Sequence, residues 1–162
     1  MIGRPPKEDV IYMLDFGFSK KVSVKSEADR ELMRFVPTLE YASRENHRGM
    51  QRSRMDDIEM WAYMIIDLLD TKNLSWRHLI HLHLLRFEKE ELLLRKKKKL
   101  FKKPIKFAGK TPKGFDKILA EVDTMTFTSE PNYLLLTQML QEIGAKVFCC
   151  DAWGNALRFI SH

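Results

Sequence analysis

A short acidic turn near the start of the chain is the first feature whose residue types could do chemistry. Asp15, Phe16 and Gly17 directly follow residues 10–14, an apolar run rich in β-formers that predicts a short buried strand. A carboxylate at the end of a rigid strand can bind Mg²⁺ that bridges nucleotide phosphates, and a glycine lets the following loop change direction. Taken alone, the three residues favour an ordinary turn at the end of a strand.

A cluster of positive charge is the second such feature. Residues 95–103 (RKKKKLFKK) hold seven of the 28 lysines and arginines and no acidic residue. The net charge of the chain is +6, so the remainder is close to neutral. The candidate anion patch comprises Arg95, Lys96, Lys97, Lys98, Lys99, Lys102 and Lys103.

Three interpretations of this segment remain open. The first is a solvated helix end, whose cations complement the negative end of the helix dipole. The second is a patch for an anionic partner, meaning nucleic acid, acidic lipid or an acidic protein. The third is a nuclear import signal, for which the composition is suitable. No zinc-finger, helix-turn-helix or RRM signature indicates base-specific recognition.

Histidines and cysteines give weaker signals. His78 and His81 are three residues apart and could share a helix face, whereas His83 points elsewhere, so partly exposed histidines are a better interpretation than a metal site. Cys149 and Cys150 are adjacent, a spacing that rarely forms a relaxed disulfide, and they are expected to be reduced thiols.

Length and composition exclude several classes of protein. A chain of 162 residues has room for one domain or for part of a larger one. Two cysteines are too few for a disulfide scaffold, and no apolar run approaches the roughly 20 residues that span a bilayer. The first ten residues have no apolar core, so no signal peptide is predicted. The expected location is intracellular, in the cytoplasm, the nucleus or both.

The elements that must position these residues begin with a long loop and a central helix. Residues 15–43 show no sustained periodicity and predict a loop of unusual length for a compact domain. Residues 55–70 are apolar nearly all round, which predicts a helix buried at the domain centre. Residues 75–101 predict a second helix, with Ser75 as its N-cap and the basic segment at its end.

Residues 112–143 predict two further helices. The first has Thr111 as its cap and Pro112 at its first position, where a missing N–H costs nothing. The second opens at residues 129–131 (SEP), and Gly144 fits its C-cap.

These elements predict a mainly α fold. A single partial domain, residues 1–162, is expected to hold one or two short strands, one long loop and about four helices. A tail over residues 144–162 should pack against the rest. The strand at 10–14 cannot form a sheet alone, and the chain does not obviously contain its partners.

Several segments form an ordered set of motifs along the chain. They are residues 15–17 (DFG), 35–43 (FVPTLEYAS), 46–59 (NHRGMQRSRMDDIE), 74–77 (LSWR), 127–136 (FTSEPNYLLL) and 151–155 (DAWGN). In order and spacing these segments resemble the casein kinase 1 family of Ser/Thr protein kinases, and the resemblance covers the chain from Val10 to Trp153. The corresponding family patterns are G-T-x-x-Y-A-S followed by R-x-D-D-L/I-E near the middle of the chain, and F-x-x-x-P-D-Y-x-x-L and D-W-N near the end.

This resemblance implies the lower part of a kinase C-lobe and gives roles to individual residues. Asp15 matches the family's Mg²⁺-binding aspartate, and the family uses ATP, Mg²⁺ and a protein substrate. Asp57 matches the buried aspartate of the central helix that holds the catalytic loop, and its neighbour Asp56 is expected to be a local cap or an arginine partner. Residues 15–43 match the activation segment, whose substrate-facing positions are Phe16, Gly17, Thr38 and Tyr41.

Other parts of a kinase have no counterpart here. The sequence contains no Gly-rich loop and no H-R-D catalytic loop, and only 14 residues precede Asp15. The catalytic base, the second Mg²⁺ ligand and the nucleotide-binding lysine are therefore missing. Either a truncated product or a sequence without its upstream portion is expected.

Two departures from the family pattern lie in the predicted activation segment. Pro37 stands where the family has a glycine, which fixes φ and removes a donor. Glu40 stands where the family has a basic residue that helps to recognise acidic or phosphorylated substrates, and Glu40 would repel such groups.

Two functional hypotheses follow. In the first, the chain is part of a casein kinase 1-like enzyme for ATP-dependent phosphorylation of protein Ser/Thr, a truncated kinase or pseudokinase that is inactive in isolation. In the second, it is a non-catalytic, kinase-derived interaction module that binds protein or anionic partners through its activation-segment face and Lys-rich patch.

Overall fold

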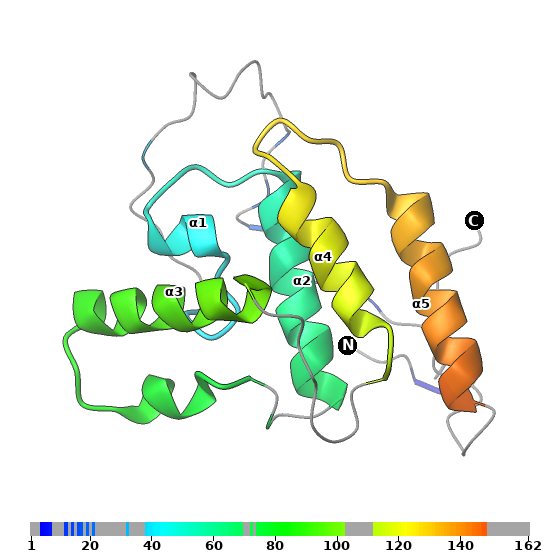
Figure 1. Cartoon of the computed structure of the whole chain (residues 1–162), viewed down its shortest axis with the longest axis horizontal. Helices are drawn as coiled ribbons and strands as arrows, with labels where there is room; N and C mark the ends of the chain where they lie inside the picture. Colours follow the sequence, from blue (N-terminus) through cyan, green and yellow to red (C-terminus); the bar gives the residue numbers. More distant parts are fainter. Residues whose placement is uncertain are drawn as a thin grey trace.

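The computed structural model shows a helical assembly around one central helix (Figure 1). It describes residues 4–7, 12, 14, 16, 17, 19, 21, 32, 38–69, 72, 74–102 and 112–148. Most of the predicted strand at 10–14 lies outside the described residues, as do Asp15, Lys103 and the tail beyond 148. Within the described residues, the β-structure is a single antiparallel bridge between Leu32 and Met50.

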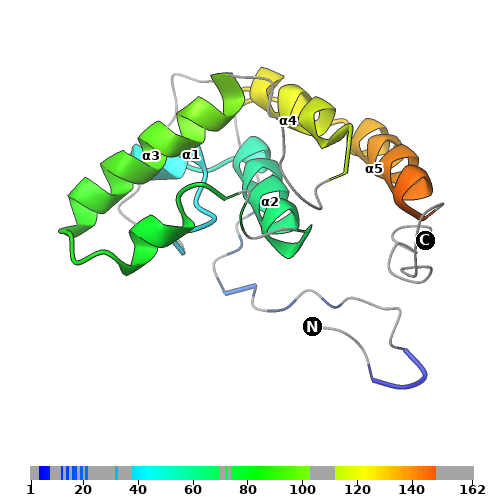
Figure 2. The same cartoon turned by 60° about the horizontal axis from the view of Figure 1, so that its bottom comes forward.

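Helix α2 (Arg54–Leu69) confirms the predicted central helix at 55–70 to within one residue at each end. It starts where the backbone N–H of Ser53 donates to Asp56 Oδ2 at 2.8 Å, one half of a capping box. Figure 2 shows α2 between the other helices, as predicted. The expectation of burial all round was wrong, because Met64 is 41% exposed and Leu68 is 74% exposed on its outer side.

The single helix expected over 75–101 is two elements. A short 3-10 helix, η3 (Arg77–His81), ends where Leu82 adopts an extended backbone, and α3 (Arg86–Lys102) begins after a break. Trp76, not Ser75, is the N-cap of η3. The start of α3 at Arg86 is stabilised because the Leu85 N–H donates to Glu88 Oε2 at 3.0 Å. Leucines occur on both sides of the break, so the apolar pattern of the sequence continues across it and does not indicate that the helix is interrupted.

The two helices expected within 112–143 are confirmed as α4 (Phe115–Thr124) and α5 (Tyr133–Phe148), with different caps. Gly114 is the N-cap of α4 and has a φ of 104°, a conformation that glycine adopts without strain. At α5 the cap is Asn132, whose Oδ1 accepts from the Leu135 N–H at 3.0 Å. Gly144 lies inside α5 and is not its C-cap, because backbone bonding continues to Phe148.

The hydrophobic core forms where α2, α3, α4, α5 and η3 meet. Helix α4 packs on α2, α5 packs on α4, and α3 contacts both η3 and the short helix α1 (Arg44–His47) (Figure 1). The most deeply buried apolar residues of this core are Ala62, Tyr63, Ile66, Leu74, Trp76, Leu93, Phe115, Ile118, Leu119, Val122 and Leu136. This core leaves α1 and the segment before it attached at one side. In the parts of the chain that the structure describes, no helix is both long and apolar enough to cross a membrane.

Candidate functional site

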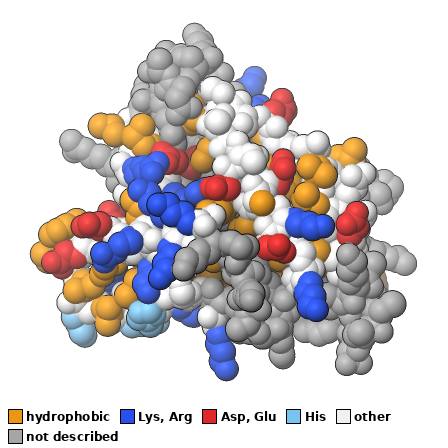
Figure 3. Space-filling view, viewed as in Figure 1, with side chains coloured by type: hydrophobic (Ala, Val, Ile, Leu, Met, Phe, Trp, Pro, Cys, Tyr) orange, Lys and Arg blue, Asp and Glu red, His pale blue; other side chains and the backbone are white. Residues whose placement is uncertain are grey.

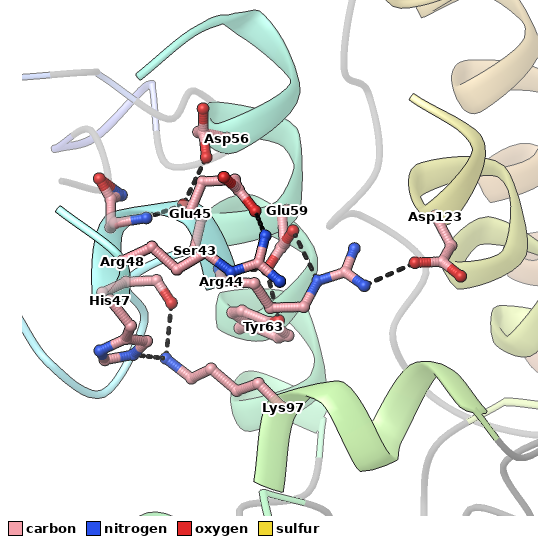
Figure 4. Close-up of polar contacts among 12 residues, drawn as sticks. Ser43, Arg44, Glu45, His47, Arg48, Asp56, Glu59, Tyr63, Lys97 and Asp123 are labelled. Carbon is pink, nitrogen blue, oxygen red and sulfur yellow. Dashed lines mark hydrogen bonds and ion pairs between the residues drawn. The ribbon is translucent and has the colours of Figure 1, made fainter. Parts of the chain in front are cut away.

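Residues 38–43 and helix α1 form one surface that rests on α2 and α3 (Figure 4). The segment turns at its start, because the N–H groups of Tyr41 and Ala42 both donate to the Thr38 carbonyl at 3.1 Å. Ala42 and Ser43 are fully buried, whereas Thr38 at the start of the turn is exposed. The end of the predicted activation segment is therefore an ordered element with one exposed side.

Asp56 joins this segment to the central helix. Ser43 caps α1 by accepting from the Asn46 N–H at 3.1 Å, and its hydroxyl donates to Asp56 Oδ1 at 2.5 Å. The other oxygen of Asp56 accepts from Ser53, so one buried carboxylate holds the starts of both α1 and α2. The expectation that Asp56 is a local cap is confirmed.

Asp57 differs from its predicted environment. The resemblance implied a buried aspartate, but the side chain of Asp57 is exposed and the buried member of the pair is Asp56. The physical reason is the helix register: Asp56, three residues after Ser53, points back to the helix start, and Asp57 is rotated about 100° away. Its predicted role toward a catalytic loop involves a motif that these 162 residues do not contain.

A buried glutamate on α2 fixes the next residue of α1. Glu59 accepts from the Arg44 backbone N–H at 2.7 Å, from Arg44 Nε at 3.2 Å and from the Tyr63 hydroxyl at 2.7 Å. Arg44 also reaches Asp123 of α4 at 2.6 Å (Figure 4). Its guanidinium carbon lies 3.7 Å from the centre of the Phe101 ring. Burial, with the neighbouring glutamate, raises the pKa of Tyr63 well above its usual value, so the phenol stays a donor.

Tyr41 is directed toward α2. Its hydroxyl donates to Asp67 Oδ2 at 2.7 Å, and this hydrogen bond raises the pKa of Tyr41 to about 12. Asp67 also pairs with Arg77 of η3, whose Nε lies 3.6 Å from Glu40 Oε1. The charge of Glu40, which is expected to repel acidic substrates, is thus partly balanced by a neighbouring cation.

Lys97 is the main correction to the predicted anion patch, because its side chain is fully buried. Its Nζ lies 2.6 Å from the Ala42 carbonyl, 3.1 Å from the Leu39 carbonyl and 3.0 Å from His47 Nε2. With 3.6 residues per turn, five consecutive residues go all the way round a helix, and one face of α3 packs against the core, so the five basic residues cannot all face outward. Lys97 lies four residues after Leu93 and so shares its buried face.

The rest of the basic segment does face outward. Arg95, Lys99 and Lys102 are exposed, and Lys96 and Lys98 are half-buried. Figure 3 shows Lys and Arg side chains gathered on the face over α1 and α3. The outward-facing residues of the segment thus belong to a positive surface that excludes Lys97, and anion binding there stays a prediction; Lys103 lies outside the described residues.

The remaining predicted residues are not brought into this site. Phe16 is 64% exposed, and Gly17 lies in a turn. His78 and His81 lie on η3, with His83 beyond it, so the helix on which their spacing was judged is not formed. Among the described residues, no group of three His, Cys, Asp or Glu side chains is arranged to hold a metal ion.

Sequence reasoning missed the long-range contacts that build the site. A signal for Lys97 was present, since Leu93, Lys97 and Phe101 repeat every four residues along one helix face. No sequence pattern indicated the role of His47, because its contact with Lys97 joins residues that are 50 positions apart in the chain.

Some known proteins are similar in sequence to this chain. No protein-family model matches the chain. Two Caenorhabditis elegans proteins, ZK507.1 and ZK507.3, whose names assign them provisionally to the serine/threonine-protein kinases, are each 29% identical, over 144 and 141 residues. The serine/threonine-protein kinase spe-6 from the same organism is 28% identical over 147 residues.

These alignments cover 87% of this chain but 40%, 31% and 37% of the relatives, so the chain spans well under half the length of the curated relatives it matches. The chain is thus similar over most of its length to proteins named as serine/threonine-protein kinases.

Proposed function

We propose that this chain is the activation-segment-bearing part of the C-lobe of a casein kinase 1-like Ser/Thr protein kinase. One observation carries the proposal: residues 38–43, which match the family's Y-A-S segment, are ordered and docked on α2 and α3 through Tyr41, Ser43 and the Ala42 carbonyl. The similarity to worm kinases over most of the chain supports it.

In this proposal the chain supplies support for a protein substrate and not the phosphate-transfer groups. Phosphoryl transfer depends on positioning and on neutralising phosphate charge. Thr38 is exposed at the start of the docked segment, where a substrate peptide would pass. ATP and Mg²⁺ remain family-based predictions, since Asp15, the one matching ligand, lies outside the described residues.

Because the sequence contains no H-R-D loop and no Gly-rich loop, the isolated chain should not transfer phosphate. The purified 162 residues, incubated with Mg²⁺, labelled ATP and casein, are expected to give incorporation at the level of the no-enzyme control. Turnover above that control, retained after a second purification step, would contradict this expectation.

A chimera tests the kinase assignment itself. The part of spe-6 that precedes its region of similarity to this chain would be joined to the start of this chain, and Ser/Thr phosphorylation of casein would be measured. The proposal expects activity that depends on Asp15, with the Asp15→Asn chimera inactive. A chimera that folds by circular dichroism and binds ATP, yet phosphorylates nothing, would argue against the assignment.

The second hypothesis, a non-catalytic interaction module, is not favoured, because the named relatives are kinases. An anionic partner for the outward-facing residues of α3 is compatible with either hypothesis.

A further inference from the structure

Lys97 is an unusual feature of this fold, a lysine with no exposed surface. It projects from α3 to residues 39–47, which precede it in the sequence by 50 to 58 positions (Figure 4). An ammonium group that is removed from water is costly unless every N–H finds an acceptor. The surroundings of Nζ therefore decide what this residue does.

Those surroundings offer three acceptors for the three N–H groups of an ammonium. They are the carbonyl oxygens of Leu39 and Ala42 and the Nε2 atom of His47. The rings of Tyr63 and Trp76 lie 5.0 and 5.3 Å from Nζ, within the range of cation–π attraction. Geometrically, the site can hold the charged form.

Protonation of Lys97 has a consequence for His47. If Nζ donates to Nε2, the imidazole proton must sit on Nδ1, which is buried and has no hydrogen-bond partner in the described structure. An unpaired buried donor is unfavourable. If Lys97 is neutral, its two N–H groups serve the two carbonyls, its lone pair accepts from Nε2–H, and Nδ1 carries no proton. Both charge states therefore hold both carbonyls.

The charged groups around the pair fit this description. Burial lowers the pKa of Lys97 to about 7, and Glu59 of α2 and Glu40 of the segment oppose that shift. Burial and the charge of Lys97 lower the pKa of His47 to about 3, so the imidazole stays neutral near pH 7. Tyr63 of α2, also nearby, stays protonated.

We infer that Lys97 is a positioning residue that ties the backbone of residues 39–42 to α3, and that His47 changes tautomer to keep this tie in both charge states of the lysine. The functional consequence rests on the proposed function: the tied segment is the support for the protein substrate. No nucleotide or substrate is needed for the tie itself.

Amide hydrogen exchange on the full chain tests the tie. In Lys97→Met, a variant of similar length without donors, the N–H groups of Tyr41 and Ala42 should exchange about tenfold faster, because their turn is no longer held. Amides of α4 should be unchanged, and the exposed Lys99→Met should match the wild type. Unchanged exchange at Tyr41 and Ala42, or an equal increase in every helix, would overturn the inference.

The tautomer is tested in the wild type, so the result does not depend on a variant that folds. The ¹⁵N shifts of the His47 ring are followed from pH 6 to pH 9, alongside the Lys97 Cε shift. The proton is expected to move from Nδ1 to Nε2 as Lys97 titrates. A ring that keeps one tautomer while Lys97 titrates would refute the pairing, whatever the chimera does with casein.

Discussion

Asp56 shows at the residue scale how one buried carboxylate organises a local site. Its two oxygens accept from the Ser43 hydroxyl and from the Ser53 backbone, at the starts of α1 and α2. The sequence marked an Asp-Asp pair and assigned burial to Asp57, whereas the structure buries Asp56.

Removing this carboxylate should destabilise the fold. The Asp56→Ala variant leaves two buried donors without their acceptor, which is expected to cost about 2–4 kcal/mol of unfolding free energy. Asp57→Ala, at the exposed neighbour, should cost less than about 0.5 kcal/mol. Urea unfolding followed by circular dichroism measures both, and equal losses would show that Asp56 has no special role.

His47 should make the stability depend on pH. Its pKa is lowered from 6.5 to about 3 by burial and by Lys97, so between these values the unfolded chain binds a proton that the folded chain does not. Stability should therefore rise with pH across this window, by up to about 1.4 kcal/mol per pH unit from this residue.

The matched variants are His47→Gln and the exposed His78→Gln. Thermal unfolding between pH 4 and pH 7 should show a weaker rise for His47→Gln and an unchanged rise for His78→Gln. If His47→Gln kept the full wild-type rise, the low pKa of His47 would be wrong.

Helix α3 combines two roles at the element scale. Its inner face carries Leu93 and Lys97 and joins the core, and its outer face carries Arg95 and Lys99. The 3.6-residue period separates these faces, so a basic run in the sequence becomes a buried contact and a positive surface at once.

We expect the outer face of α3, with Arg95 and Lys99, to bind polyanions. Arg95→Ala combined with Lys99→Ala is expected to lower the salt concentration that elutes the chain from heparin, because two phosphate- or sulfate-facing charges are lost. The matched control is Lys113→Ala with Lys117→Ala, two exposed lysines at and before α4, with the same change in net charge. Equal shifts for both pairs would indicate a general charge effect and no patch.

At the scale of the whole molecule, the described surface includes several large apolar side chains. On α2 these exposed side chains are Met64 and Leu68. Between the end of η3 and the first turn of α3 they are Leu82, Leu85 and Phe87. Contiguous exposed apolar surface favours association between molecules, and we expect these side chains to contribute to it.

Leu68→Lys should therefore reduce self-association without loss of stability, because a side chain that is 74% exposed contributes little to the core. Light scattering against protein concentration measures association, and thermal unfolding checks the fold. Thr124→Lys, an exposed position that gains the same charge, is the control. Similar scattering from Leu68→Lys and the wild type would show that this apolar side chain does not drive association.

Much of the helical architecture was predictable because local patterns determine it. The apolar density of α2 and the spacing in α4 are contained within single segments and predict helices there. The break between η3 and α3 was not predictable from periodicity, because leucines continue across it while Trp76 and Leu79 are held in the core.

By itself, the sequence determined the order of the helices, the cluster of positive charge and the resemblance to kinases, all of which depend on residue type and local spacing. The tertiary structure decided which aspartate is buried and that Lys97 is buried and not part of the positive surface. It also decided that His47 contacts Lys97. The physical reason is that burial and hydrogen bonding between α1, α2 and α3 depend on how distant helices pack, and packing fixes which face of each helix is inside.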